Sequence, residues 1–227
     1  MSETAWVRTF HARHGRRSAL TEDRLARLLP RYAVPAGLLE RVPPWGEPET
    51  VVLDVGCGHG AAALAYATAY PCRQVVAVDV HRAGVARMLA GAEETGITNL
   101  SAHVGDAVEL LRDRVGQGTL AAVHLFFPDP WPKSRHRRRR FVSAARLDLL
   151  ASRLAPDGHV LVATDDEDYA AYVMRQVRVH GAFTAYRVRR PSWRPVAGYE
   201  AKGLRAGREI TELRLDRSDV VGTYPAR

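Results

Sequence analysis

The sequence predicts an α/β fold, in which a mostly parallel, seven-stranded sheet carries helices on both faces and has one antiparallel edge strand. From about residue 50 onward, short apolar runs typical of buried strands alternate with segments of helical periodicity. A helix between two strands lets the chain cross back over the sheet, so the strands on either side of it run parallel. The last two expected strands have no such helix between them, which predicts the antiparallel edge.

The expected elements follow one another in a regular order. The strands are residues 51–55, 74–80, 100–104, 120–127, 159–163, 184–189 and 209–215. The helices between them are residues 61–69, 83–95, 107–114, 138–154 and 167–179. A glycine turn leads from the first strand into the first of these helices, and Pro156-Asp157-Gly158 turns the chain into the fifth strand.

Residues 1–46 are expected to form a basic N-terminal arm and linker ahead of an α/β domain at residues 47–227. Leucines at helical spacing predict a helix over Ala19–Leu29, with Thr21 as a possible N-cap. The residues Pro43-Pro44-Trp45-Gly46 are typical of a linker, and we place the entry into the domain directly after them.

Composition excludes several classes of protein. The chain has 227 residues, of which 46% are hydrophobic, and this is enough for one domain with a sizeable core. No apolar run approaches about 20 residues, so we expect no membrane span, and the N-terminus has no signal-peptide core. Of the only two cysteines, Cys57 and Cys72, the first lies in the glycine turn. A structural disulfide is therefore not expected, and a reducing cytoplasm fits.

The charge is distributed unevenly along the chain, whose net charge is +8. Residues 47–120 contain nine acids against five arginines, whereas residues 1–31 contain seven arginines against three acids. Residues 185–217 contain nine cations against four acids. This polarity predicts an acidic cofactor half and a basic face for a polyanion. For the scattered arginines, a solvated surface remains the alternative.

Three strand ends carry acids that are suited to a nucleoside cofactor. Asp54 begins the glycine turn, Asp79 ends the second strand where ribose hydroxyls would bind, and Asp106 follows the third strand near an adenine amino group. The glycine turn alone is compatible with NAD, FAD or S-adenosylmethionine, but a cationic sulfonium suits an acidic pocket better than a pyrophosphate does. A helix-capping Asp106 and a merely tight turn are the structural alternatives. The candidate cofactor-binding residues are Asp54, Gly56, Gly58, Gly60, Asp79 and Asp106.

The most informative segment follows the fourth strand, where Pro128-Asp129-Pro130-Trp131-Pro132 precedes six cations within residues 133–140. A stiff turn thus carries a carboxylate and an indole beside an anion-binding patch, an arrangement suited to holding a heteroaromatic base and its phosphates. Trp131 either stacks on a base or packs the turn. If a helix starts near Arg138, the cations lie at its positive end, which costs stability and favours phosphate contact over a solvated face.

The same segment resembles a family signature. The matching segments are residues 127–141, 78–81 with 84–85, 99–100 with 105–107, 164–165, part of 194–203, and 8–10 with 15–16. Together they resemble the tRNA (guanine-N7)-methyltransferases over nearly the whole chain. The resemblance implies a Rossmann-like class I methyltransferase domain at residues 47–227. It also implies methyl transfer from S-adenosylmethionine to N7 of a guanine in the tRNA variable loop.

The resemblance also implies residue roles. Asp129 becomes the catalytic carboxylate, which accepts hydrogen bonds from guanine and offsets the charge of the product. The expected substrate-binding residues are Lys133, Asp165, Ala197 and Glu200, and the expected RNA-binding residues are Arg135, Arg137, Arg138, Arg139 and Arg140. The expected partner is tRNA, with no membrane, no metal, and a monomeric or homodimeric state in the cytoplasm. His11 and His14 are an isolated pair and are not expected to bind metal.

Several positions depart from the family pattern. Ala197 stands where threonine is usual, Arg208 where histidine is usual, and Thr211-Glu212-Leu213 where Trp-Asp-Leu is common. Asp54 and Asp79 replace the more usual glutamates, which is a mild change. The substrate half is therefore partly altered. The alternatives are a methyltransferase for another RNA or a small purine-like molecule, and a catalytically silent RNA-binding protein.

Overall fold

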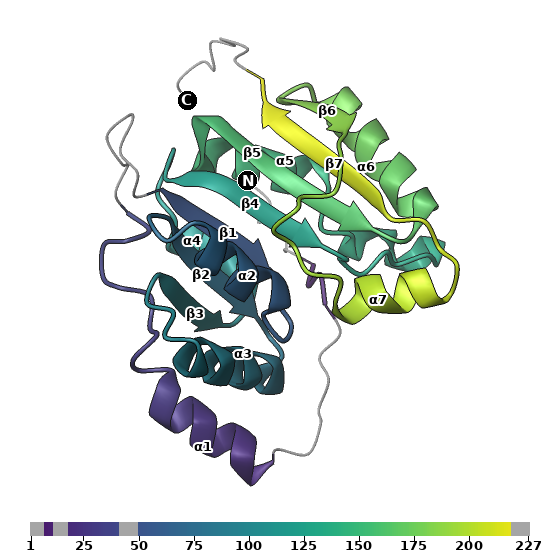
Figure 1. Ribbon diagram of the computed structural model, residues 1–227. Coiled ribbons are helices and arrows are strands. Elements are labelled where there is room, and N and C mark those ends of the chain that lie inside the picture. The colour runs from purple at the N-terminus through teal and green to yellow at the C-terminus, as the bar shows by residue number, and fades with distance from the viewer. Residues whose placement is uncertain (1–6, 11–17, 41–49, 219–227) are drawn as a thin grey trace.

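A computed structural model describes residues 7–10, 18–40 and 50–218, and it shows one seven-stranded sheet (Figure 1). The strands lie in the order β3-β2-β1-β4-β5-β7-β6. They are β1 Val51–Val55, β2 Gln74–Asp79, β3 Leu100–Val104, β4 Leu120–Phe126, β5 Leu154–Thr164, β6 Phe183–Arg187 and β7 Thr211–Arg217. The helices are α1 Ala19–Leu28, α2 Ala61–Ala69, α3 Arg82–Glu94, α4 Ala107–Asp113, α5 Ala144–Arg153, α6 Glu167–His180 and α7 Gly198–Arg205, with a 3₁₀ helix η1 over Ser134–Arg139.

The sheet confirms the predicted fold class. Strands β1 to β5 pair in parallel, because helices connect them in sequence. The antiparallel strand is β7, which lies between β5 and β6 at one end of the sheet. Since β6 is antiparallel to β7, the outermost strand points in the same direction as the parallel ones.

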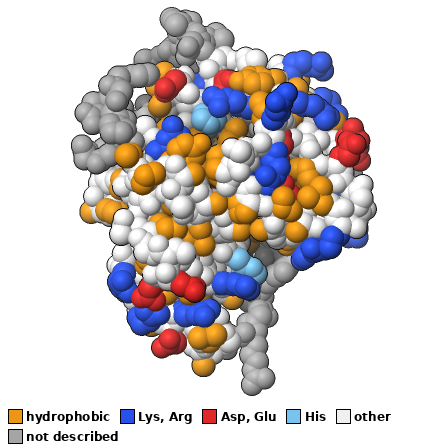
Figure 2. All heavy atoms as spheres, in the orientation of Figure 1, with side chains coloured by type: hydrophobic (Ala, Val, Ile, Leu, Met, Phe, Trp, Pro, Cys, Tyr) orange, Lys and Arg blue, Asp and Glu red, His pale blue; other side chains and the backbone are white. Residues whose placement is uncertain are grey.

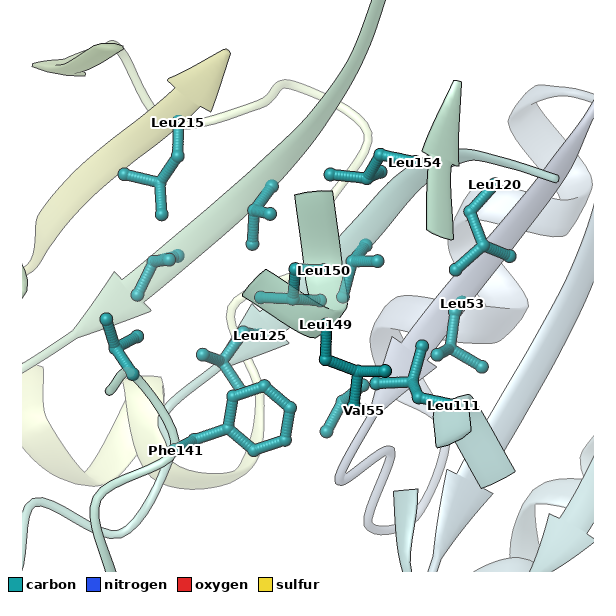
Figure 3. Packing of buried hydrophobic residues seen from close by; sticks show 14 of the residues in the cluster. Leu53, Val55, Leu111, Leu120, Leu125, Phe141, Leu149, Leu150, Leu154 and Leu215 are labelled. Atoms are coloured by element: carbon teal, nitrogen blue, oxygen red, sulfur yellow. The ribbon is translucent and has the colours of Figure 1, made fainter. Parts of the chain in front are cut away.

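Helices cover both faces of the sheet, and each face has its own apolar core. Figure 3 shows the first core, in which leucines of β1, β4 and β5 meet those of α4 and α5. Helix α6 closes the same face with Tyr169, Val173 and Val177, which are at most 1% exposed. Helices α1, α2 and α3 cover the opposite face. Strand residues alternate between the two cores, so the strands are apolar on both sides.

The described part of the N-terminal arm is integrated into the domain. Leu25 and Leu28 of α1 are buried in the core of the α2–α3 face, and Figure 1 shows α1 beside α3. The amide of Ala102 in β3 donates to the carbonyl of Tyr32, at 2.8 Å. The predicted linker around Pro43 and the boundary at residue 46 lie outside the described residues.

Three local predictions were wrong. The side chain of Ser18, not Thr21, caps α1 by accepting from the amide of Thr21. The helix expected over 138–154 is divided into η1 and α5, and Phe141 and Val142 between them are buried in the core. Helix α7 was not predicted at all. Cations therefore fill η1 and do not crowd the N-terminus of α5, so the helix-dipole argument for phosphate contact does not apply.

Within the described residues, no helix combines the length and the apolar character that crossing a membrane requires.

Candidate active site

The carboxyl ends of the parallel strands bring the three predicted cofactor acids to one edge of the sheet. Asp54 lies in β1, Asp79 is the last residue of β2, and Asp106 follows β3. The register places Val55 beside Val78 and Asp79 beside Val104, so the three strands end close together. In open α/β sheets this edge is where ligands bind.

The glycine loop between β1 and α2 is held in a left-handed backbone conformation. Gly56, Gly58 and Gly60 have φ angles of 72°, 56° and 80°, which other residues rarely adopt. The amide of Gly58 donates to Oδ2 of Asp79 at 2.7 Å. A Cβ atom on Gly84 of α3 would lie 2.4 Å from the carbonyl oxygen of Gly58. Glycine at position 84 thus lets the loop pack tightly on α3.

Asp54 is the most unusual charge in this loop. It is 2% exposed, and its Oδ2 has no hydrogen-bond partner among the residues that the structure describes. Burial and, to a smaller extent, the neighbouring Asp79 raise the pKa of Asp54 to about 7, although Arg194 acts in the opposite direction. A buried carboxylate with an unused oxygen is suited to a cationic ligand.

Asp79 and Asp106 both stabilise the local backbone. Oδ1 of Asp79 accepts from the amide of His81 at 2.7 Å, while Oδ2 holds Gly58 as described. Oδ1 of Asp106 accepts from the amide of Val108 at 2.8 Å and caps α4. Asp106 therefore does cap α4, and a contact with the cofactor would be a second role of the same side chain. Asp79 likewise shapes the glycine loop before it meets a ligand.

The turn after β4, residues 127–131, is strained at both ends. Phe127 and Trp131 have φ angles of 53° and 44°, in the left-handed region that aromatic residues rarely adopt. The amide of Phe127 donates to the carbonyl of Ala163 in β5 at 2.7 Å, which fixes the start of the turn to the sheet. Such strain persists only where the surroundings hold it, and it is common at functional sites. We call this segment the Asp129 turn.

Trp131 and Arg140 anchor the Asp129 turn from the protein side, and Asp129 itself is exposed. Trp131 is 4% exposed, and its Nε1 donates to the carbonyl of Thr9 at 3.1 Å. Nε of Arg140 donates to the carbonyl of Pro130 at 2.7 Å. Of the two interpretations of Trp131, packing of the turn is thus the one that the structure supports. The turn presents the Asp129 carboxylate at a fixed position.

The cationic segment, residues 133–140, divides into exposed and buried parts. Lys133, Arg135, Arg137 and Arg138 are exposed. Arg139 is half-buried, with its guanidinium 4.9 Å from the centre of the Trp131 ring. Arg140 is 5% exposed and lies over Tyr172 of α6, at 4.4 Å. The expectation that Arg140 binds RNA phosphate does not fit this burial, because its guanidinium supports the turn.

Glu200, an expected substrate-binding residue, lies in a buried charge network. It is 2% exposed and pairs with Arg190, and with Arg194 at 3.3 Å. Arg194 is 3% exposed, pairs also with Glu212 of β7, and lies 4.6 Å from the ring centre of Phe126. Glu200 is thus engaged inside the protein, where it fixes α7, and a contact with substrate stays a prediction. Sequence reasoning missed the network, because charge patterning along the chain does not reveal burial.

Helix α7 lies beside the carboxyl ends of β4 and β5 (Figure 1). A Cβ atom on Gly203 of α7 would lie 2.9 Å from Cβ of Asp165, so the helix approaches the end of β5 closely. Oδ2 of Asp165 accepts from Nε and a terminal nitrogen of Arg208, at 2.9 and 2.7 Å. Ala197 occupies the N-cap position of α7, where it supplies no side-chain hydrogen bond. Two of the family departures thus lie next to α7: Ala197 at its N-cap, and Arg208 just after it in an ion pair with Asp165.

Across residues 7–10, 18–40 and 50–218, no group of three or more His, Cys, Asp or Glu is arranged to hold a metal ion. The pair His11 and His14 lies outside those ranges.

Comparison with known proteins agrees with this geometry. A family profile described as putative methyltransferase matches residues 48–213. A tRNA (guanine-N(7)-)-methyltransferase of Halorhodospira halophila is 38% identical over 94% of this chain and 96% of that protein. One of Nitrosospira multiformis is 36% identical over 91% and 93%. The solved structure of an rRNA methylase from Streptococcus thermophilus, with a TM-score of 0.52 at 16% identity, covers 91% of this chain and 99% of its own and supports the fold. The profile and the two relatives together show that the chain belongs to the tRNA (guanine-N7)-methyltransferase family.

Proposed function

We propose that this protein transfers a methyl group from S-adenosylmethionine to N7 of a guanine in the variable loop of tRNA. The observation that carries the proposal is the Asp129 turn, which presents an exposed carboxylate on a strained, well-anchored backbone between the cofactor edge and the cationic segment. Membership of the family supports the reaction and the substrate class. A tRNA substrate also fits the cytoplasm as the place of action.

The residues at the cofactor edge fit S-adenosylmethionine. This cofactor, when bound, supplies an electrophilic methyl group on a positively charged sulfur. Oδ2 of Asp54, which has no hydrogen-bond partner among the described residues, is a buried acceptor for a cationic or amino group. The left-handed glycines expose backbone for close approach, and Asp79 and Asp106 lie where ribose hydroxyls and the adenine amine would be recognised. The acidic character of the pocket disfavours a pyrophosphate-bearing dinucleotide.

The chemistry of guanine N7 explains why the site needs so few catalytic groups. N7 carries an in-plane lone pair and no proton, so the reaction requires alignment but no general base. We assign to Asp129 the recognition of N1–H and the exocyclic amine of the guanine. Its negative charge also offsets the positive charge that the purine gains during the transfer. The anchored turn keeps the carboxylate in place before the substrate arrives, so little reorganisation is needed.

The exposed cations supply the grip on RNA. We assign to Lys133, Arg135, Arg137 and Arg138 contacts with phosphates on either side of the target guanine. Arg139 contributes mainly by covering Trp131, and Arg140 by holding Pro130. All proposed contacts come from one chain, so the reaction is compatible with a monomer or a homodimer.

One observation favours a second candidate, in which the same chemistry acts on another RNA. Asp165 was expected to contact the substrate, yet its carboxylate is engaged by Arg208 in a two-point ion pair. A substrate that needs Asp165 must displace Arg208, whereas a different RNA can leave the pair intact. Arg208→His would then raise activity on tRNA if tRNA uses Asp165, and would leave it unchanged otherwise.

The test is methyl transfer from labelled S-adenosylmethionine into tRNA, followed by nucleoside analysis. We expect N7-methylguanosine from the wild type. Asp129→Asn should lower kcat by about 10²-fold, as expected for one lost electrostatic stabiliser, with cofactor affinity unchanged. The pH–rate profile should show no essential base near neutrality. Methylation of an exocyclic amine, or a base requirement abolished by Asp129→Asn, would contradict the mechanism.

A further inference from the structure

We propose that helix α6 extends the RNA-binding surface of the cationic segment, with Arg175 and Arg178 contacting phosphates of the tRNA beyond the nucleotides next to the target guanine. The inference rests on the proposed function, since it names further contacts of the same substrate. Its basis is the position of α6 beneath η1 and the charge state of the arginines on its exposed side.

Arg175 and Arg178 are exposed and carry uncompensated charge. In the described ranges, neither forms an ion pair with an acidic side chain. Asp148 of α5, which faces the end of α6, bonds His180 instead, at 2.9 Å. The acids of α6 itself, Glu167 and Asp168, lie in its first turn.

Three arginines on the other side of the molecule are instead paired with acids. Arg27 and Arg31 near α1 both pair with Glu93 of α3, at 2.6 and 2.5 Å, and Arg82 pairs with Glu22 at 2.8 Å. Figure 2 shows the result over α1 and α3, where blue and red side chains lie next to each other. A surface of alternating sign attracts a polyanion weakly, whereas unpaired arginines keep their full charge for it.

Buried contacts fix η1 on α6. The guanidinium of Arg140, at the end of η1, lies 4.4 Å from the ring centre of Tyr172 and 5.6 Å from that of Tyr169, both in α6. Burial raises the pKa of Tyr172, and the positive charges of Arg137 and Arg175 are among those that oppose this rise. Arg137 of η1 and Arg175 of α6 therefore both lie close enough to Tyr172 to act on it, and the stacked Arg140 joins the end of η1 to the same helix.

Helical geometry aligns the arginines in a row. Tyr172, Arg175 and Arg178 are three residues apart, so they share one side of α6 and span about 9 Å along its axis at 1.5 Å per residue. With the exposed Arg137 and Arg138 of η1, the row leads away from the Asp129 turn. An elongated track of fixed guanidinium groups matches a phosphate backbone, whose charges are regularly spaced.

A charge-matched pair of variants tests the inference. The double variant Arg175→Gln/Arg178→Gln removes two charges from the row of arginines on α6. The control, Arg24→Gln/Arg87→Gln, removes two charges from the α1–α3 side. Within the described residues, Arg24 and Arg87 also lack an ion pair. Affinity for a fluorescently labelled tRNA transcript is measured by anisotropy over a range of salt concentrations. Cofactor affinity and kcat at saturating tRNA are measured in parallel.

The α6 double variant should bind tRNA on the order of 5- to 30-fold more weakly near physiological salt, with the slope of log affinity against log salt reduced by about one to two units. Its kcat and cofactor affinity should match the wild type, and Arg175→Lys/Arg178→Lys should restore most of the slope. The α1–α3 double variant should behave as the wild type. Equal loss in both double variants, or no loss in the α6 variant, would overturn the inference. A wild type that binds tRNA through α6 but makes no N7-methylguanosine would instead contradict the proposed function alone.

Discussion

We propose that Asp54 sacrifices folding stability for cofactor binding. Its carboxylate is buried beside Asp79, and its Oδ2 lacks a partner within the described part of the chain, so the ionised form is costly before a ligand arrives. If Asp54 served only the fold, an uncharged residue could take its place without loss of folding stability. The cost becomes understandable if a cationic cofactor completes the site, because the ligand then supplies the missing charge.

Replacement of Asp54 separates its cost to folding stability from its contribution to cofactor binding. Because its folded pKa is raised to about 7, Asp54 contributes stability fully below its unfolded pKa near 4, and this contribution is lost as the pH rises through 7. Asp54→Asn should therefore gain about 2–3 kcal/mol relative to the wild type between pH 5 and pH 8. Urea denaturation at both pH values measures this. Cofactor affinity at pH 8, by calorimetry, should fall at least about tenfold. A pH-independent stability difference with unchanged cofactor affinity would remove Asp54 from the site.

Arg194 connects the two halves of the site at the residue scale. It is buried against Phe126 at the end of β4, pairs with Glu200 of α7 and Glu212 of β7, and opposes the raised pKa of Asp54. Removing one member of a buried ion pair leaves an uncompensated charge, which is strongly destabilising. The placement of α7 and the charge of the cofactor edge thus depend on the same guanidinium.

At the scale of elements, η1 and the Asp129 turn form one unit. The turn is strained at Phe127 and Trp131, and Arg140 and Thr9 hold it from below. A longer α5 reaching back to Arg138 would place Arg140 in a regular helix. The short 3₁₀ segment instead leaves Arg140 buried while Arg135, Arg137 and Arg138 are exposed.

This division predicts two distinct kinds of variant. The triple variant Arg135→Gln/Arg137→Gln/Arg138→Gln should raise the KM for tRNA and lower its salt slope by about two to three units, with kcat little changed. Arg140→Gln should instead lower kcat and thermal stability while leaving the salt slope unchanged, since its partner is Pro130. Steady-state kinetics at several salt concentrations, with thermal melts, distinguish the two. A reduced salt slope in Arg140→Gln would place Arg140 on phosphate after all.

Helix α7 begins without a side-chain cap, because Ala197 occupies the N-cap position. Ala197→Thr supplies a hydroxyl that can accept from an amide of the first turn, which should raise the unfolding free energy by about 0.5–2 kcal/mol. Activity on tRNA should stay the same or rise, by at most about tenfold. Urea denaturation and initial rates on unmodified transcript measure both. Lower activity in a stabilised variant would show that the site is shaped for a different target.

At the scale of the whole molecule, the sheet could be predicted because strands buried on both faces leave long apolar runs between helical segments. The three acids proposed to bind the cofactor could be predicted to lie together, because the parallel strands end at one edge. Helix α7 could not, since its segment contains glycines and few apolar residues, and tertiary contacts through Glu200 and Gly203 hold it. The opposite roles of Arg138 and Arg140 were also hidden, because adjacent arginines in the sequence give no sign of which one is buried.

The central claim is that the chain methylates a ring nitrogen that has no proton, at one guanine of tRNA. The most direct measurement uses transcripts in which that guanine is replaced by 7-deazaguanine, which keeps N1–H and the exocyclic amine but lacks N7. We predict that this transcript accepts no methyl group. It should still compete with the normal transcript, with an inhibition constant near the KM of the normal transcript, because Asp129 and the cationic surface recognise its N1–H, exocyclic amine and phosphates. Methyl transfer to the 7-deaza transcript at a rate comparable with the normal one would contradict the account.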